Sequence, residues 1–185
     1  MTVDETLHKQ IETDMWTWIH EFVTVPNSFY EGRFAPCPYA RAAVIARTVD
    51  LAVWTSGDVR TFIRSRAEEV RDTPDLTTRV MVFPPRVQFA WGISDWIEMQ
   101  NADLIPDNIF LNPGIAKTTT SRYPNSPPNP YFMVVANSLA PVLAGARSLA
   151  KSNYYKDWPQ EHYALVVERR ARLAALYGRK PAVTK

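Results

Sequence analysis

The only cysteine of the chain has the surroundings that most favour chemistry. Cys37 stands between Pro36 and Pro38, directly before an alanine-rich stretch with helical pattern. Because proline suits the first position of a helix, this spacing places Cys37 at the N-cap of a helix that runs to about Arg47. The helix dipole and the free amides favour a thiolate there, and Arg41 adds a cation one turn later. We therefore predict that Cys37 is a nucleophile or a ligand, with simple packing as the alternative.

Polar and cationic residues accompany the cysteine in two irregular segments, 26–36 and 112–130. If the two segments meet at one end of a sheet, their cations and a helix N-terminus would bind a carboxylate or a phosphate. Open α/β sheets also hold ligands where loops leave the strand ends. The alternative is that the arginines form ordinary surface ion pairs. The predicted substrate-binding residues are Arg33, Arg41, Lys117, Arg122 and Asn125, and Tyr39 and Tyr123 are predicted to orient the substrate or to move a proton.

Other chemistries have less support in the residues. The dipeptide Cys37-Pro38 also occurs at some haem-binding sites, so a haem-thiolate protein is a lesser alternative. The three histidines stand far apart and lack the spacing of metal ligands, so no metal is predicted. Neither a glycine-rich phosphate loop nor a Gly-x-Ser-x-Gly elbow is present. The identity of any cofactor stays open.

Charge and apolar patterning limit the classes of partner. The formal net charge is +2 and the arginines are scattered, so nucleic acid is not an expected partner. Polar residues and a proline interrupt the longest apolar stretch, 131–150, so no membrane span is predicted. The start of the chain lacks the pattern of a secretory signal, and a single cysteine fits a reducing cytoplasm. Association into a homo-oligomer is compatible with this sequence.

Hydrophobic periodicity predicts the elements that position these residues. Helices are expected over 3–23, 37–47, 58–70, 86–102, from Ser138 onwards, and from Pro159 to Gly178. Strands are expected over 49–53, 78–83 and 109–111, and 131–136 is either a strand or a helical turn. This order predicts an α/β fold: a small sheet of three to four strands covered by helices, with helical N- and C-terminal extensions. We expect one domain over 1–178 and a flexible tail over 179–185.

Three details of these helices can be compared with a structure. The first helix is expected to open with a capping box at Thr2 and Glu5. The helix after Cys37 is expected to bury a row of four side chains, which are Tyr39, Ala42, Ala43 and Ala46. The last helix carries a row at helical spacing that consists of Tyr163, Val166, Arg170, Leu173 and Tyr177.

Several motifs occur in an order that is found elsewhere. They are an N-terminal helix with tryptophans, the motif Cys37-Pro38-Tyr39-Ala40 at the start of a helix, a strand that ends in proline, and the segment Ser121-Arg122-Tyr123-Pro124-Asn125-Ser126-Pro127. In this order the chain resembles an uncharacterised bacterial family with a Cys-Pro-Phe/Tyr-Ala motif, known only as a domain of unknown function. The chain departs from the family pattern at Asn112-Pro113, where the family has His-Pro. The resemblance implies the limits of the domain and the pairing of the two motifs, and it implies no activity.

These observations predict a cytoplasmic bacterial enzyme that acts on a small anionic, carboxylate-bearing metabolite, with specialised biosynthesis as one setting. Arg33, Arg41 and Arg122 would hold the anion, and Cys37 would act on it. The rival prediction is a non-enzymatic interaction or oligomerisation protein. Its six tryptophans and proline-rich loop would then bury the surface of a partner.

Overall fold

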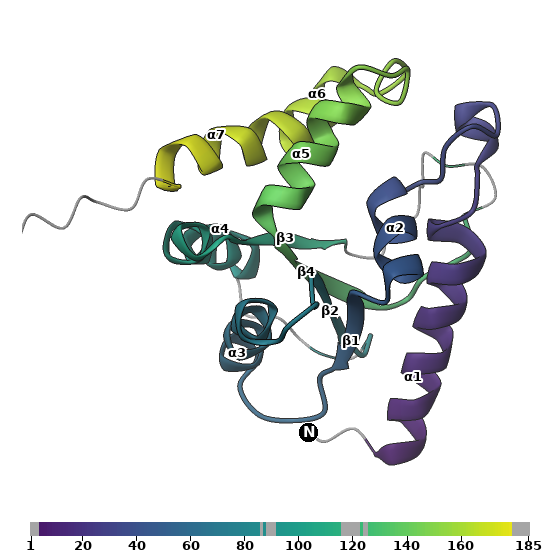
Figure 1. The fold of residues 1–185 in the computed structure, drawn as a ribbon. Coiled ribbons are helices and arrows are strands. Elements are labelled where there is room, and N and C mark those ends of the chain that lie inside the picture. The colour runs from purple at the N-terminus through teal and green to yellow at the C-terminus, as the bar shows by residue number, and fades with distance from the viewer. Residues whose placement is uncertain (1–3, 86, 88–91, 116–122, 124–125, 179–185) are drawn as a thin grey trace, which may run out of the picture.

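A four-stranded mixed sheet lies at the centre of the computed structural model (Figure 1). The structure describes residues 4–85, 87, 92–115, 123 and 126–178. The strands are β1 (Val49–Val53), β2 (Thr78–Phe83), β3 (Ile109–Ile115) and β4 (Phe132–Ser138), in the order β1-β2-β4-β3. β1 and β2 are parallel, whereas β4 is antiparallel to both of its neighbours. The predicted α/β fold is confirmed, and residues 132–136 of the undecided segment 131–136 belong to β4.

One face of the sheet is covered by α3 (Val59–Asp72) and α4 (Ile93–Leu104). Asp58 begins α3 by accepting a hydrogen bond from the amide of Thr61 at 2.8 Å. Both faces of β2 are buried, which explains its nearly continuous apolar sequence. Met81 and Phe83 point to this face, and Val80 and Val82 to the other. The carboxamide of the fully buried Asn101 on α4 bonds the backbone of Leu111 in both directions, at 2.8 and 3.0 Å.

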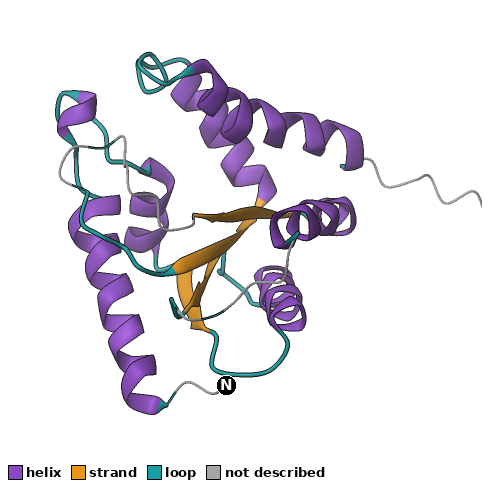
Figure 2. Ribbon diagram, turned by 180° about the vertical axis from the view of Figure 1, so that it is seen from behind, coloured by secondary structure: helices purple, strands orange, loops and turns teal. Residues whose placement is uncertain are grey.

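The opposite face carries two groups of helices (Figure 2). α1 (Glu5–Trp18) and its π-helical continuation η1 (Ile19–Val23) pack on β1 and β2 through Ile11, Met15 and Ile19. The short 3-10 turn η2 (Ser28–Tyr30) and α2 (Pro38–Ala46) follow. The amide of Leu7 donates to the side chain of Asp4, so the N-cap of α1 is Asp4 and the expected capping box with Thr2 is wrong. Thr2 itself lies outside the described residues.

The second group is a C-terminal helical hairpin beside β3. It consists of α5 (Leu139–Ala150), α6 (Gln160–Tyr163), the π-helical turn η4 (Ala164–Glu168) and α7 (Arg169–Tyr177). Its core contact is a small cluster in which Phe110 of β3 meets Leu139, Leu173 and Ile105 of the 3-10 turn η3 (Ile105–Asp107). The helical extensions predicted at both ends are confirmed, whereas the predicted tail 179–185 lies outside the described residues.

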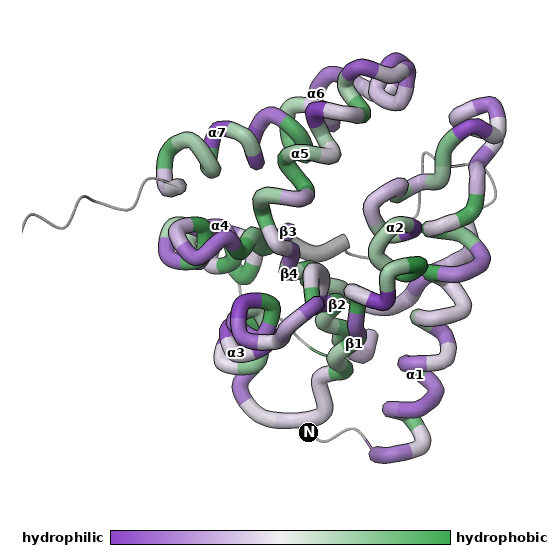
Figure 3. Tube along the Cα trace, viewed as in Figure 1, coloured by the Kyte–Doolittle hydropathy of each residue, from purple (hydrophilic) through white to green (hydrophobic). Residues whose placement is uncertain are grey.

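The burial predicted for the helix after Cys37 is wrong in part. Cys37 and Pro38 occupy the N-cap and first position of α2 as expected, but none of the residues of α2 is fully buried. Tyr39 and Ala43 are half-buried, whereas Ala42 and Ala46 are exposed. Hydrophobic residues occur along α2 (Figure 3), and Ile45 among them is exposed.

Two further boundaries differ from the expected ones. α4 begins at Ile93, and residues 86 and 88–91 of the predicted helix lie outside the described part. The strand predicted over 109–111 continues to Ile115 through an irregular register after Asn112. Among the described helices, none has the length and apolar composition that crossing a membrane requires.

Candidate functional site

The backbone before Cys37 is anchored by two phenols on one carbonyl group. The hydroxyl of Tyr154 donates to the carbonyl oxygen of Pro36 at 2.7 Å, and the hydroxyl of Tyr123 donates to it at 3.3 Å. The amide of Cys37 donates to the carbonyl oxygen of Val23, at the end of η1, at 3.1 Å. The N-terminus of α2 is therefore held by segments that lie far apart in the sequence.

Aromatic rings tie the segment 27–37 to the turn after α5. Tyr30 stacks on Tyr154 with ring centroids 4.6 Å apart, and its hydroxyl accepts a hydrogen bond from the indole of Trp158 at 2.9 Å. The hydroxyls of Tyr30 and Tyr123 lie 3.2 Å apart. Tyr155 packs edge-on against Trp158 and Tyr154. This aromatic contact brings the N-terminus of α2 close to the C-terminal hairpin.

The thiol of Cys37 is enclosed by protein although the residue as a whole is partly exposed. Burial raises the pKa of the thiol above its ordinary value, and this effect exceeds the opposing pull of the Ala40 and Tyr39 amides and of Arg170. The helix N-terminus thus lowers the pKa of the thiol, as expected, but desolvation raises this pKa by more. Cys37 is a neutral thiol at physiological pH.

Tyr39 bridges α2 and α5. A Cβ atom at Gly145 would approach Cδ1 of Tyr39 to 2.9 Å and Cε1 more closely still, so only glycine leaves room for the ring. The buried hydroxyl of Tyr39 lies beside that of Tyr155 and makes no hydrogen bond to any other described residue. Burial, followed by the neighbouring phenol of Tyr155, raises the pKa of Tyr39 well above its ordinary value, and burial also raises the pKa of Tyr155.

Arg170, near the start of α7, is the charged group of this region. It is 7% exposed, and its guanidinium carbon lies 5.4 Å from the ring centroid of Phe110. Its Nε–H group has no acceptor in the described part of the chain. Burial lowers the pKa of Arg170, and Tyr39, Tyr155 and Cys37 are the groups that most strongly counteract this effect. The adjacent Arg169, by contrast, pairs with Glu98 at 3.2 Å.

Within the part of the chain that the structure describes, Arg170 therefore has no counter-ion. No side-chain carboxylate in the described residues pairs with it, and the remaining positions contain no aspartate or glutamate. Cys37, Tyr39, Tyr155 and Arg170 form what we call the Arg170 cluster. A guanidinium only donates hydrogen bonds, and the phenols and the thiol are protonated. The cluster is rich in donors and suits an anionic acceptor, but it offers no general base.

Arg33 and Arg41, the predicted cations that lie within the described residues, each contact a group other than Cys37. Arg33 is exposed and pairs with Glu31 at 2.8 Å, which is the ordinary surface pairing weighed as the alternative. Arg41 is also exposed and donates to the carbonyl oxygen of Thr24 at 3.3 Å. Tyr123 reaches the carbonyl of Pro36, so the long loop does meet the cysteine segment at this residue.

The other three predicted binding residues lie outside the described residues; they are Lys117, Arg122 and Asn125. Arg170 and Tyr155 are the members of the cluster that sequence reasoning missed. The sequence contains one indication of Arg170, because this residue stands in the otherwise apolar and aromatic row of the last helix. An arginine in such a row is either buried or a break in the pattern, and here it is buried.

Both π-helical turns of the described chain adjoin the cluster. η1 ends at Val23, whose carbonyl holds the amide of Cys37, and η4 directly precedes Arg169 and Arg170. Single π-helical turns within helices are frequent at functional sites. No group of three or more His, Cys, Asp or Glu side chains that could hold a metal ion occurs among the described residues.

Comparison with known proteins leaves the function to be inferred from the site. No protein-family model matches the chain, and no match is found among curated proteins or among solved structures.

Proposed function

We propose that this protein is an enzyme that binds a small carboxylate-bearing metabolite at the Arg170 cluster. The proposal keeps the anionic substrate inferred from the sequence and moves the principal cation from Arg33, Arg41 and Arg122 to Arg170. The observation that carries it is the buried guanidinium without a counter-ion. An unpaired buried charge costs several kcal/mol, and an anion that enters the cluster would recover this free energy.

The neighbouring side chains match a carboxylate. The buried hydroxyl of Tyr39 lies beside the phenol of Tyr155, so the two hydroxyls present a pair of protonated donors to a ligand. A carboxylate can accept from a guanidinium and from a phenol at the same time, because its two oxygens offer several lone pairs. Cys37, Tyr39 and Tyr155 each expose part of their surface, although the thiol of Cys37 and the hydroxyl of Tyr39 are themselves buried.

The same arrangement suits chemistry in which negative charge develops on oxygen. Donors that are already in place around an oxyanion stabilise it without reorganisation. Tyr39 and Tyr155 would act as protonated donors. Cys37 would act as a neutral thiol that contacts the substrate, and attack by its sulfur would first require loss of the proton that burial retains.

Isothermal titration with acetate, succinate and inorganic phosphate tests the proposal on the intact chain. We expect saturable binding of at least one carboxylate, with affinity reduced at least tenfold in Arg170→Met because the charge-assisted pair is lost. Tyr39→Phe should weaken binding by about fivefold, since one hydrogen bond is worth about 1 kcal/mol. Arg169→Met is the matched control and should bind like the wild type. Equal binding by Arg170→Met and wild type would refute the proposal.

A second candidate function is that of an interaction protein, and exposed apolar side chains favour it. Ile45 on the outer side of α2 is 73% exposed, and Leu165 in η4 is 58% exposed. Large exposed apolar groups of this kind are frequent where a partner binds. Light scattering of the purified protein separates the two candidates. A monomer that binds a carboxylate supports the enzyme, and a stable oligomer that Ile45→Ser dissociates supports the interaction protein.

A further inference from the structure

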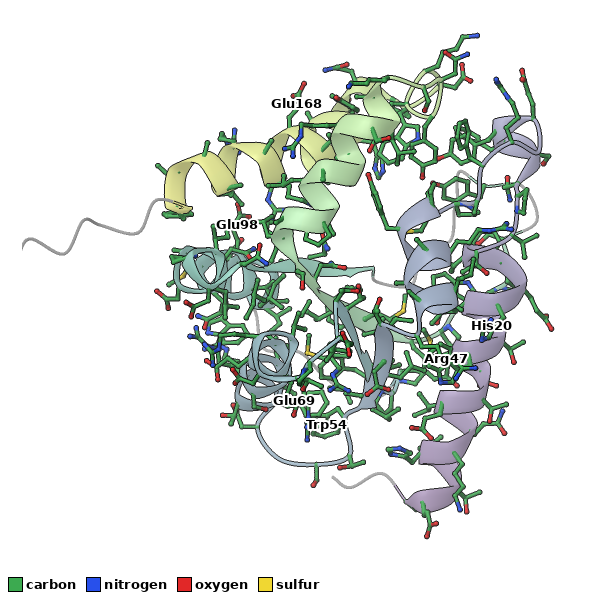
Figure 4. The ribbon with its side chains drawn as sticks, viewed as in Figure 1. His20, Arg47, Trp54, Glu69, Glu98 and Glu168 are labelled. Atoms are coloured by element: carbon green, nitrogen blue, oxygen red, sulfur yellow. The ribbon has the colours of Figure 1, made fainter. Side chains whose placement is uncertain are left out.

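A hollow at the edge of the sheet shares no lining residue with the Arg170 cluster. It has a volume of about 230 Å³ and is lined by Trp16, His20, Val44, Arg47 and Val49. These residues come from α1, from η1 and from the junction of α2 with β1 (Figure 4). Ligand pockets for drug-sized molecules measure roughly 300–1,000 Å³. The hollow therefore suits a ligand with a single ring.

The walls of the hollow are apolar and aromatic. Trp16, Val44 and Val49 pack against the core beneath α1 but remain partly exposed, so a ligand would cover apolar surface that solvent now reaches. The ring of Trp16 stacks on that of His20, with centroids 5.5 Å apart and an interplanar angle of 26°. This stack holds the indole in place and favours a flat ligand, because aromatic rings attract one another in offset or edge-on contact.

The rim of the hollow supplies positive charge without a matching acid. Arg47 ends α2 in the left-handed conformation, with φ 57°, and its amide bonds the carbonyl of Val44 at 3.1 Å. The backbone at Arg47 is thereby fixed, and its side chain makes no ion pair with any described residue. The undescribed positions contain no acidic side chain. His20 and Arg47 lie beside each other at the same hollow (Figure 4).

We propose that this hollow binds a small aromatic carboxylate. The ring would lie against Trp16 and between the side chains of Val44 and Val49. The carboxylate would accept hydrogen bonds from the guanidinium of Arg47 and from the imidazole of His20. The planar guanidinium matches the planar carboxylate in geometry. This site is independent of the Arg170 cluster and of the function proposed for it.

Titration of the ¹⁵N-labelled protein with benzoate tests the inference through the indole N–H resonance of Trp16, which Trp16→Phe identifies. We expect this resonance to move saturably, with a Kd on the order of 1–10 mM for so small a ligand. Arg47→Asn should weaken binding by about fivefold, as expected for one partly exposed charge pair. Asparagine tolerates the left-handed conformation, so this variant should remain folded. Arg60→Gln is the matched control, because Arg60 lies over Trp96 elsewhere in the molecule.

Two further probes separate the contributions of charge and ring. Benzamide has the ring without the charge, and cyclohexanecarboxylate has the charge without the flat ring. We expect each to bind at least threefold more weakly than benzoate. Equal binding of either probe, or an unchanged Trp16 resonance with benzoate, would overturn the inference. Loss of the effect in Arg170→Met would overturn it too, because the response would then belong to the other site.

Discussion

Replacing Arg170 with methionine should make the ligand-free protein more stable. The guanidinium is buried and unpaired, and its Nε–H group lacks an acceptor among the described residues. An unsatisfied buried donor costs about 1–3 kcal/mol, and replacing buried charges with apolar side chains of similar volume often stabilises a protein by about 1–4 kcal/mol. The variant also loses the cation–π contact with Phe110 at 5.4 Å, worth about 1 kcal/mol. The expected net gain is about 1 kcal/mol.

Thermal unfolding at pH 7 without added carboxylate or phosphate measures this gain. For a domain of this size, about 1 kcal/mol corresponds to a rise in Tm of about 2–4 °C. Arg169→Met is the matched control on the same helix. Arg169 pairs with Glu98 at 3.2 Å, so its loss should lower the free energy of unfolding by about 1 kcal/mol.

The sign of the change in the free energy of unfolding of Arg170→Met decides whether Arg170 is unpaired in solution. A stabilised variant that no longer binds anions would show that Arg170 serves binding at the expense of stability. If Arg170→Met instead lowers the free energy of unfolding by 2 kcal/mol or more, the guanidinium has a structural partner, and its interpretation as an unpaired cation is refuted.

Three further predictions concern separate parts of the molecule. Gly145→Ala should displace the Tyr39 ring and lower stability by about 1–3 kcal/mol, measured by urea unfolding, and Ala144→Gly is its control. Alkylation of Cys37 by iodoacetamide should show a midpoint above the ordinary thiol pKa of about 8.5, and a midpoint below 8 contradicts a desolvated thiol. Asn101→Leu should cost about 3 kcal/mol, because it leaves the amide and the carbonyl of Leu111 without partners, and a cost below 1 kcal/mol would refute that role.

The raised pKa of Cys37 also predicts a pH dependence of stability. The unfolded chain loses the thiol proton at about pH 8.5, whereas the folded chain keeps it to higher pH. The free energy of unfolding should therefore fall as the pH rises above about 8.5. The hydroxyl of the Cys37→Ser variant does not ionise in this pH range. The difference in the free energy of unfolding between the two proteins should therefore change over the same range. A difference that stays constant from pH 7 to pH 10 would contradict the shift.

The elements that depend on local sequence could be predicted. The apolar and β-branched run of Thr78–Phe83 forms a buried strand, and proline after Cys37 opens a helix, because both features depend on adjacent residues. The segment 131–136 could not be assigned, since a short apolar run fits a strand or a helix equally well. The prediction of which side of α2 faces the protein was wrong in part, because packing against α1 and α5 decides which side is covered.

The candidate site could be predicted only in part. Cys37 and Tyr39 are separated only by Pro38, and the Cys-Pro-Tyr-Ala motif contains both of them. Arg170 and Tyr155 reach them through the pairing of the C-terminal hairpin with the segment 27–37, which no spacing in the sequence encodes. The predicted cation Arg33 instead forms an ion pair with Glu31 on the surface. Arg170, by contrast, stands within an apolar row and is buried without an ion pair among the described residues.

The Nε–H resonance of Arg170 tests the central claim most directly. Arginine-selective ¹⁵N labelling, with Arg170→Met to identify the signal, allows this group to be followed while acetate and succinate are added. If the Arg170 cluster binds a carboxylate, the resonance moves saturably, and it does so at concentrations that leave the Nε–H resonance of the exposed, ion-paired Arg33 unchanged. A resonance of Arg170 that stays fixed, or that moves only in linear proportion to salt together with Arg33, would contradict the claim.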